Sequence, residues 1–311
     1  MRRTISDMAP AQFRMAAGFT LIELIVVMVI SGLISGAIVV LVRQPLNNYV
    51  EASQRTETAD IADAALRQIA RELRMAVPNT IRISADGRAL EFIPALAGGR
   101  YFAPGDVSNA GEAALNFSNP GATVFTATFA DPPAPIAPPS PFAAGNFIIV
   151  YNLGTNFSLV DAYQTGAANG NRAQIVGVAG NNITFGDPQA AGPPTNVNVF
   201  ARAAPLENGS PTQRFHVASG PVIYRCQPRA SGGTGQLRRI TGQGFNAVQA
   251  IPAAAGLGDL LVDNVQTCLF NSVVSAHRNG ALVSLQLTVQ RAGSNQPTLT
   301  LFRQLQVDNT P

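Results

Sequence analysis

The longest hydrophobic run in the chain lies near its N-terminus, from Leu24 to Val42. These 19 residues carry no charge, and as a helix they would be about 28 Å long, which matches the hydrocarbon core of a bilayer. Residues 1–18 before the run are polar and basic and contain no apolar stretch. The pattern therefore predicts a helix that spans a membrane once over residues 24–42, with the basic segment held on the cytoplasmic side.

Beyond Val42 the apolar positions become periodic. From about Asn47 to Val77 they recur at every third or fourth residue, which predicts an amphipathic helix with one face on a core. The stripe consists of Ile61, Ala62, Ala65, Leu66, Ile69, Leu73 and Val77. Pro45 predicts a kink or a local opening, because proline lacks an N–H and its ring clashes with the preceding turn. Since Pro78 stops a helix, we expect one N-terminal helix over residues 19–78.

Residues 79–311 change to the alternating pattern of β-strands. We expect strands at 123–129, 147–151, 214–217, 221–226, 236–240, 264–270, 281–290 and 299–307. Within 281–290 every second residue is a large aliphatic one, as in an antiparallel sheet with one buried face. Residues 131–141 are rich in proline and predict an exposed loop, while the topology of residues 95–210 cannot be read. The expected fold class is α+β, with a long helix packed on a mainly antiparallel, β-rich head.

The residues just before the apolar run are Gly18-Phe19-Thr20-Leu21-Ile22-Glu23. An ordinary secretory signal loses its apolar region on cleavage, whereas a cut after Gly18 would leave the apolar run on the mature protein. Glu23 is unusual, because a carboxylate at the edge of a membrane span costs about 2–3 kcal/mol on insertion scales and is a functional candidate for that reason. A free amine on Phe19, one helical turn away, could neutralise it, as could the amine of a neighbouring subunit.

This hexapeptide resembles the cleavage and methylation signature of type IV prepilins and of the pseudopilins of type II secretion. The resemblance implies a type IV pilin-like fold, removal of the leader 1–18 after Gly18, and N-methylation of Phe19 by a prepilin peptidase and methyltransferase. It also implies that Glu23 guides the registration of each subunit in the growing filament. The implied partners are other major and minor pilins, the pilus assembly platform and inner-membrane lipid. The implied location is the bacterial inner membrane, with one span and a periplasmic head, and then a pilus or pseudopilus.

The C-terminal third carries a second resemblance, to a minor-pilin-like component of the mannose-sensitive haemagglutinin (MSHA) pilus machinery. It rests on residues 214–215, 219–222, 224–226, 237–239, 265–268 and 307–311, with support from residues 44–45 and 61–79. The resemblance implies a minor structural subunit that takes part in the assembly, the initiation or the tip of a pilus. Two alternatives stay open: a type II secretion pseudopilin that moves folded exoproteins, and a pilus-tip binding module for a sugar, a surface or DNA.

Charge changes the expected partners only slightly. The formal net charge is +3, and all 21 basic side chains are arginines. Three arginines and one aspartate precede Phe19, so loss of the leader would leave 18 arginines against 17 acids. The mature chain would be nearly neutral, which gives no reason to expect a nucleic-acid partner.

The chain has two cysteines, Cys226 and Cys268. A lone pair behind an export-type N-terminus predicts one disulfide in an oxidising compartment. Two buried free thiols are the alternative.

Candidate chemistry beyond the N-terminus is sparse. No nucleophile elbow, phosphate-binding loop or dinucleotide-binding glycine pattern occurs in its required strand–helix context, so we expect neither enzymatic activity nor a cofactor. Asp161, Asp259 and Asp263 are candidate calcium ligands, but they lack the regular spacing of a ligand loop and we expect no metal.

A group of arginines around Cys226 and a glycine-rich turn could form a basic patch for DNA. The group consists of Arg225, Arg229, Arg238 and Arg239. Few aromatic residues lie between them, so solvated or interface arginines are the simpler interpretation, and nucleic acid is not an expected partner.

Overall fold

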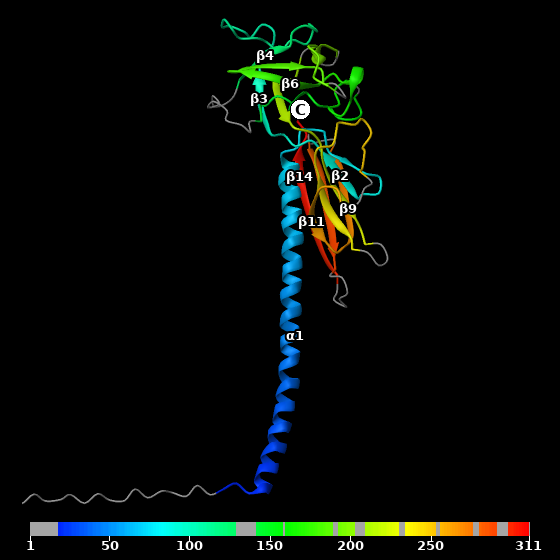
Figure 1. The fold of residues 1–311 in the computed structure, drawn as a ribbon. Coiled ribbons are helices and arrows are strands. Elements are labelled where there is room, and N and C mark those ends of the chain that lie inside the picture. Colours follow the sequence, from blue (N-terminus) through cyan, green and yellow to red (C-terminus); the bar gives the residue numbers. More distant parts are fainter. Residues whose placement is uncertain are drawn as a thin grey trace, which may run out of the picture. The chain divides into compact units, whose positions relative to one another are not determined.

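The structure is a computed structural model of the whole chain (Figure 1). It describes residues 18–128, 141–157, 159–188, 192–202, 209–229, 234–252, 256–275, 280–290 and 298–310. The predicted leader, apart from Gly18, and the predicted proline-rich loop, apart from Pro141, lie outside the described residues. The chain divides into two compact units, Met1–Glu57 and Thr58–Pro311.

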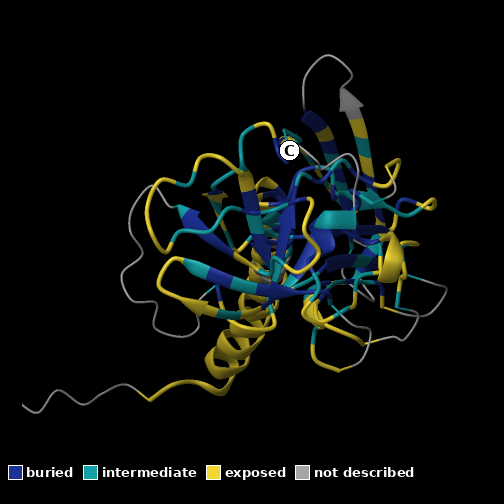
Figure 2. Ribbon diagram, turned by 90° about the horizontal axis from the view of Figure 1, so that it is seen from above, coloured by how far each residue is buried: buried dark blue, intermediate teal, exposed yellow. Residues whose placement is uncertain are grey.

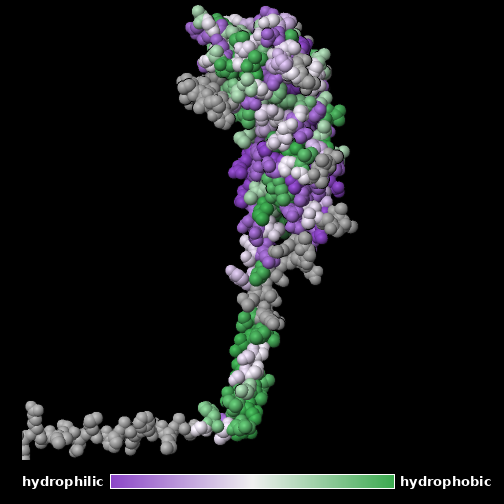
Figure 3. Space-filling model, viewed as in Figure 1, coloured by the Kyte–Doolittle hydropathy of each residue, from purple (hydrophilic) through white to green (hydrophobic). Residues whose placement is uncertain are grey.

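The first unit contains most of the helix α1 (Leu21–Arg74). Its segment Leu21–Val42 is 22 residues long, apolar enough to cross a membrane, and 0% buried. Figure 3 colours the helix surface over this segment mostly hydrophobic, with some patches of intermediate hydropathy. The apolar N-terminal helix predicted from the sequence is therefore confirmed. The helix also continues through Pro45 without a break, so the predicted local opening is wrong, whereas the kink stays a prediction.

The last turns of α1 belong to the second unit and bury one face. The buried residues are Ala62, Ala65, Leu66, Ile69, Ala70 and Leu73. Ile61, which the pattern placed on this face, is 48% exposed. The helix ends at Arg74, four residues before the predicted end, because the next residues pair with an extended segment instead. The Val77 N–H donates to the Ile93 carbonyl at 2.8 Å, and the Ala95 N–H donates to the Met75 carbonyl at 2.7 Å.

Two antiparallel sheets share a hydrophobic core with this helix face (Figure 1). The five-stranded sheet has the order β1 (Arg82–Ile83), β2 (Ala89–Phe92), β9 (Val222–Gln227), β10 (Gln236–Ile240) and β11 (Asp259–Asp263). The three-stranded sheet has the order β12 (Val265–Ser275), β13 (Gly280–Val289) and β14 (Leu299–Asp308). In β13 the alternate aliphatic residues are buried, as predicted. A single N-terminal helix with a mainly antiparallel β-rich region confirms the expected α+β class.

Described strands of residues 95–210, whose topology could not be read from the sequence, form a closed antiparallel barrel together with the predicted strand at residues 214–217. Its strands are β3 (Ala97–Tyr101), β4 (Val124–Thr128), β5 (Phe147–Val150), β6 (Arg172–Ala179), β7 (Asn182–Gly186) and β8 (Arg214–Ala218), in the order β3-β4-β7-β6-β5-β8. Two short 3-10 helices, Gly166–Ala168 and Val199–Arg202, lie in its connections. Side chains such as Phe125, Phe185 and Phe215 fill the interior, and Figure 2 shows buried residues concentrated in the strands. The barrel is therefore a second packed core rather than a pore.

A buried polar cluster joins β1 and β2 to the barrel side of the unit. Arg82 pairs with Glu91 at 2.8 Å, and its guanidinium lies 3.4 Å from the centroid of the Tyr163 ring. The Tyr163 hydroxyl donates to the Thr80 carbonyl at 2.8 Å. Burial raises the pKa of Glu91, and the neighbouring Arg82 charge opposes that rise. We call Arg82, Glu91 and Tyr163 the Arg82 cluster.

Candidate functional site

The candidate processing and assembly site is the segment Gly18–Glu23. Gly18, Phe19 and Thr20 precede the helix, and all three are exposed. Phe19 is 78% exposed, and a side chain added at Gly18 would meet nothing within 4 Å. The Gly18–Phe19 peptide bond is therefore uncovered by the described residues, as a bond cut by a peptidase must be.

Thr20 begins the helix by capping it. Its Oγ1 accepts a hydrogen bond from the Glu23 N–H at 3.3 Å, and its carbonyl accepts one from the Leu24 N–H at 3.2 Å. Thr20 and Glu23 have the Thr-x-x-Glu spacing of a capping box. A carboxylate at the third helical position also interacts favourably with the positive end of the helix dipole. Glu23 thus stabilises the helix start in addition to any role toward an amine.

This cap changes the predicted relation between Phe19 and Glu23. Because Thr20 is the cap, Phe19 lies outside the helix, and the helical i,i+4 spacing between the two residues is absent from the uncleaved chain. The sequence contained the signal, since a threonine three residues before a glutamate at the head of an apolar run is a helix-start pattern. The charge of Glu23 alone, on which the sequence prediction rests, gives no indication of the Thr20 cap.

The two cysteines lie on different sheets. Cys226 is in β9 and Cys268 is in β12, both are buried, and the structure joins them by a disulfide. Their Cα atoms are 6.4 Å apart, within the range that a disulfide spans. The bond connects the five-stranded sheet to the three-stranded sheet beside the helix core.

The four arginines considered for DNA binding do not form one patch. Arg225 and Arg238 are cross-strand partners on one face of β9 and β10, whereas Arg239 reaches Glu72 of α1 at 3.0 Å. Arg238 donates to the Gly258 carbonyl at 2.9 Å, and Arg225 donates to the Pro252 carbonyl. Three of the four side chains are therefore engaged in holding strands, loops and helix together.

The three candidate calcium ligands are also separate. The carboxylate of Asp161 accepts hydrogen bonds from the Tyr163 N–H at 3.1 Å and from the Gln164 side chain at 3.2 Å. Asp259 and Asp263 lie at opposite ends of β11. Across the described ranges, no three His, Cys, Asp or Glu side chains gather as a metal site would require.

Comparison with known proteins supports the N-terminal site. A family model described as the prokaryotic N-terminal methylation motif matches residues 13–39, which include Gly18, Phe19, Glu23 and most of the apolar helix. The motif indicates the class of type IV pilin-like proteins and pseudopilins, which are structural proteins. It is the substrate signal of the prepilin peptidase, and pilins assemble with other pilins. The helix Leu21–Val42 fits the membrane anchor of such a protein. No curated protein and no solved structure matches the chain.

Proposed function

We propose that the chain is a minor pilin-like structural subunit that takes part in assembling or initiating a type IV pilus of the MSHA type, or lies at its tip. The observation that carries the proposal is the methylation motif at residues 13–39, which runs into a helix whose apolar segment Leu21–Val42 is 0% buried among the described residues. An apolar helix of this length needs either lipid or other helices around it. A pilin helix has both in turn, first in the membrane and then in the filament.

In this proposal the peptidase removes residues 1–18 and the new N-terminal Phe19 is methylated. Cleavage leaves the Thr20 cap intact, so the helix start survives processing. It also creates a cationic amine four residues before Glu23. Glu23 could pair with that amine or with the amine of a neighbouring subunit. Either pairing would lower the free-energy cost of an otherwise unpaired charge at the edge of the apolar core. Residues 19–78 then serve as anchor and filament core, and residues 79–311 form the periplasmic head.

A minor position is supported by the size and the make-up of the head. It combines two sheets, a disulfide and a separate barrel, and such a bulk is hard to repeat along a slim filament. The described tail residues that resemble the MSHA pilus biogenesis protein MshO lie in or next to β8, β9, β10, β12 and β14. We therefore propose a role like that of MshO, with the prepilin peptidase, other pilins and the assembly platform as partners.

The test compares Glu23→Gln with Glu57→Gln in cells that carry the other filament genes. Both substitutions remove one exposed carboxylate from the same helix, but only Glu23 lies at the apolar span. We expect both variants in the membrane fraction and only Glu57→Gln in filaments sheared from the surface. Equal recovery of the two variants would refute the assembly role of Glu23.

Mass spectrometry of the mature protein tests the processing step separately. We expect an N-terminal Phe19 carrying one methyl group, and an intact Met1 would contradict the proposal.

Deletion of the gene then separates the pilus from a secretion pseudopilus. Loss of surface filaments supports the pilus, whereas loss of secreted exoproteins with unchanged filaments would assign the chain to type II secretion.

A further inference from the structure

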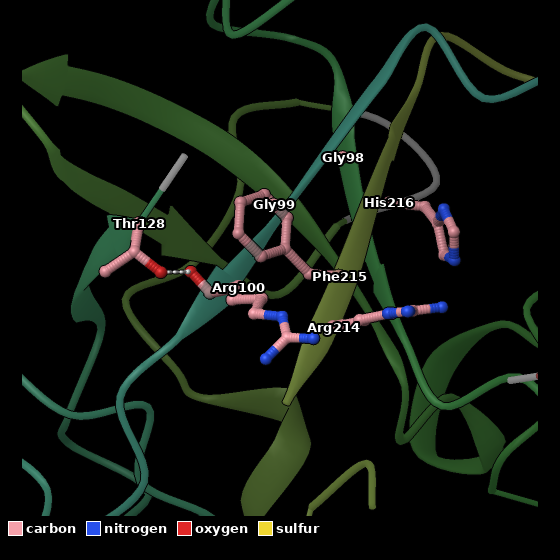
Figure 4. Close-up of a pocket in the computed structure, with 7 residues that line it drawn as sticks. All are labelled: Gly98, Gly99, Arg100, Thr128, Arg214, Phe215 and His216. Carbon is pink, nitrogen blue, oxygen red and sulfur yellow. Dashed lines mark hydrogen bonds between the residues drawn. The ribbon is translucent and has the colours of Figure 1, made fainter. Parts of the chain in front are cut away.

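The outer surface of the barrel has a hollow of about 450 Å³ on strands β3, β4 and β8 (Figure 4). It is lined by Gly98, Gly99, Arg100, Thr128, Arg214, Phe215 and His216. The volume falls within the usual range for sites that hold small molecules. The hollow is far from the methylation motif in the sequence and plays no part in the assembly role proposed above.

The glycines of β3 create the hollow. Gly98 faces His216 across the β3–β8 pair and leaves the space beside the imidazole unfilled. A Cβ atom at Gly98 would lie 3.0 Å from the Phe215 carbonyl oxygen, which is closer than ordinary packing allows. A larger residue would therefore both fill the hollow and press on the neighbouring strand.

Two arginines stand directly opposite each other beside this space. Arg100 and Arg214 are register partners. The next pair along, Tyr101 and Gln213, is hydrogen-bonded, with the Tyr101 N–H donating to the Gln213 carbonyl at 3.0 Å. Because hydrogen-bonded and non-hydrogen-bonded pairs alternate, Arg100 and Arg214 form a non-hydrogen-bonded pair, the kind whose side chains come closest. Like charges in such a pair destabilise a sheet.

The two charges are only weakly compensated within the described part of the chain. Neither guanidinium forms an ion pair or a hydrogen bond with any described residue. Arg214 lowers the pKa of Asp308, though less than the hydrogen bonds from Thr310 do, so Asp308 offsets part of the Arg214 charge without forming an ion pair with it. The N–H donors of Arg100 and Arg214 therefore have no acceptor among the described residues.

His216 adds a neutral donor or acceptor to the charged pair. It is half-buried, and burial followed by the Arg214 charge lowers its pKa below the usual value of 6.5. At neutral pH the imidazole is therefore uncharged and can donate one hydrogen bond and accept another. The Thr128 hydroxyl lies on the other side of Arg100 and donates to the Arg100 carbonyl at 3.3 Å.

We infer that this hollow binds the anionic group, a carboxylate or a phosphate, of a sugar-sized ligand. Guanidinium groups match both oxyanions through paired N–H donors. An anion between Arg100 and Arg214 turns a repulsive pair into an attractive triad, and the imidazole can bind a ligand hydroxyl. The barrel would then be a binding module carried by this chain. Binding at the hollow does not require that the chain assembles into a filament.

The experiment uses the full-length protein in a non-ionic polyoxyethylene detergent and ligand-observed NMR titration. The probes are glucuronate, glucose 6-phosphate and glucose, which share a ring and differ in the anionic group. We expect binding of at least one charged sugar and none of glucose, and comparison of the two charged probes identifies the preferred oxyanion. Arg100→Gln and Arg214→Gln should each raise the Kd by about 10-fold or more, the cost of a lost charge-assisted hydrogen bond.

Arg74→Gln is the matched control, because Arg74 is an exposed arginine at the end of α1 and its loss changes the net charge equally. Unchanged affinity in this variant is expected. The affinity of the wild-type protein for the charged sugar should also fall as the salt concentration rises to about 0.3 M. This measurement does not depend on the folding of any variant. Failure of both charged sugars to bind, equal binding of glucose, or unaltered affinity in the double variant of Arg100 and Arg214 would each overturn the inference.

Discussion

The Arg82 cluster permits a quantitative test of what holds the second unit together. The substitution Arg82→Met keeps an unbranched side chain and removes the guanidinium. In the structure the Arg82 side chain is 10% exposed and that of Glu91 is 2% exposed, so the pair is buried. Arg82 also donates to the Asn246 and Ala247 carbonyls, both at 3.0 Å. The substitution therefore leaves one buried carboxylate and two carbonyls without their donor.

The expected loss follows from the burial of Glu91. Removing one partner of a buried ion pair costs about 3–5 kcal/mol of unfolding free energy, because the other charge remains without compensation. Glu91 can escape part of this cost by binding a proton, since burial already raises its pKa. When the pKa of a carboxyl group is raised in the folded state, the free energy of unfolding of the protein falls as pH rises through that pKa. The deficit of Arg82→Met should accordingly be smaller at about pH 5 than at about pH 8.

The assay is urea unfolding of the full-length protein in detergent, followed by far-UV circular dichroism at both pH values. Arg88→Met is the matched control, because Arg88 lies in the same β1–β2 hairpin but is exposed, and we expect a change within about 0.5 kcal/mol. The double variant Arg82→Met/Glu91→Leu removes the stranded carboxylate and should recover most of the loss. A deficit for Arg82→Met no larger than that of Arg88→Met, or one independent of pH, would refute the reasoning.

Three further predictions concern other parts of the same unit. Replacing Cys226 and Cys268 by alanine should lower the unfolding free energy by up to about 4 kcal/mol, as measured by urea unfolding, because the open chain regains the entropy of a loop of 42 residues. An unchanged midpoint would contradict this. The pKa of His216 is lowered, so the unfolded state binds its proton first, and stability should fall as pH drops below about 6.5. His216→Gln should abolish that part of the pH profile, and an identical profile would contradict the assignment. Arg100→Gln should raise the free energy of unfolding by about 0.2–1 kcal/mol through relief of like-charge repulsion, and a thermal scan showing a loss would count against that pair geometry.

The helix and the C-terminal strands could be predicted because their signals are local. The apolar run and the alternation in β13 each specify an element without knowledge of distant residues. The predicted strand at residues 236–240 coincides with β10. The end of α1 was misplaced because Val77 and Ala95 form backbone bonds whose partners lie outside any local pattern.

The barrel and its hollow could not be predicted for the opposite reason. β3 contains two glycines and one arginine among five residues, a composition that is poor in strand formers, and it becomes a strand because β4 and β8 pair with it. Arg100 and Arg214 are adjacent only after that pairing forms. No spacing in the sequence indicates that these two side chains share a site.

The closure of the barrel also affects the order in which the chain folds. Phe92 of β2 and Val222 of β9 are paired, although about 130 positions separate them, and closing so long a flexible loop costs about 4 kcal/mol. A formed barrel holds Ala97 beside Val217, so the effective loop between β2 and β9 shrinks to roughly ten residues and its cost falls to about 2 kcal/mol. On the folding route of lower free energy, the barrel therefore forms first and β2 pairs with β9 afterwards. Since Cys226 lies in β9, the disulfide to Cys268 would then form late, after the barrel has set the register of the sheet that carries it.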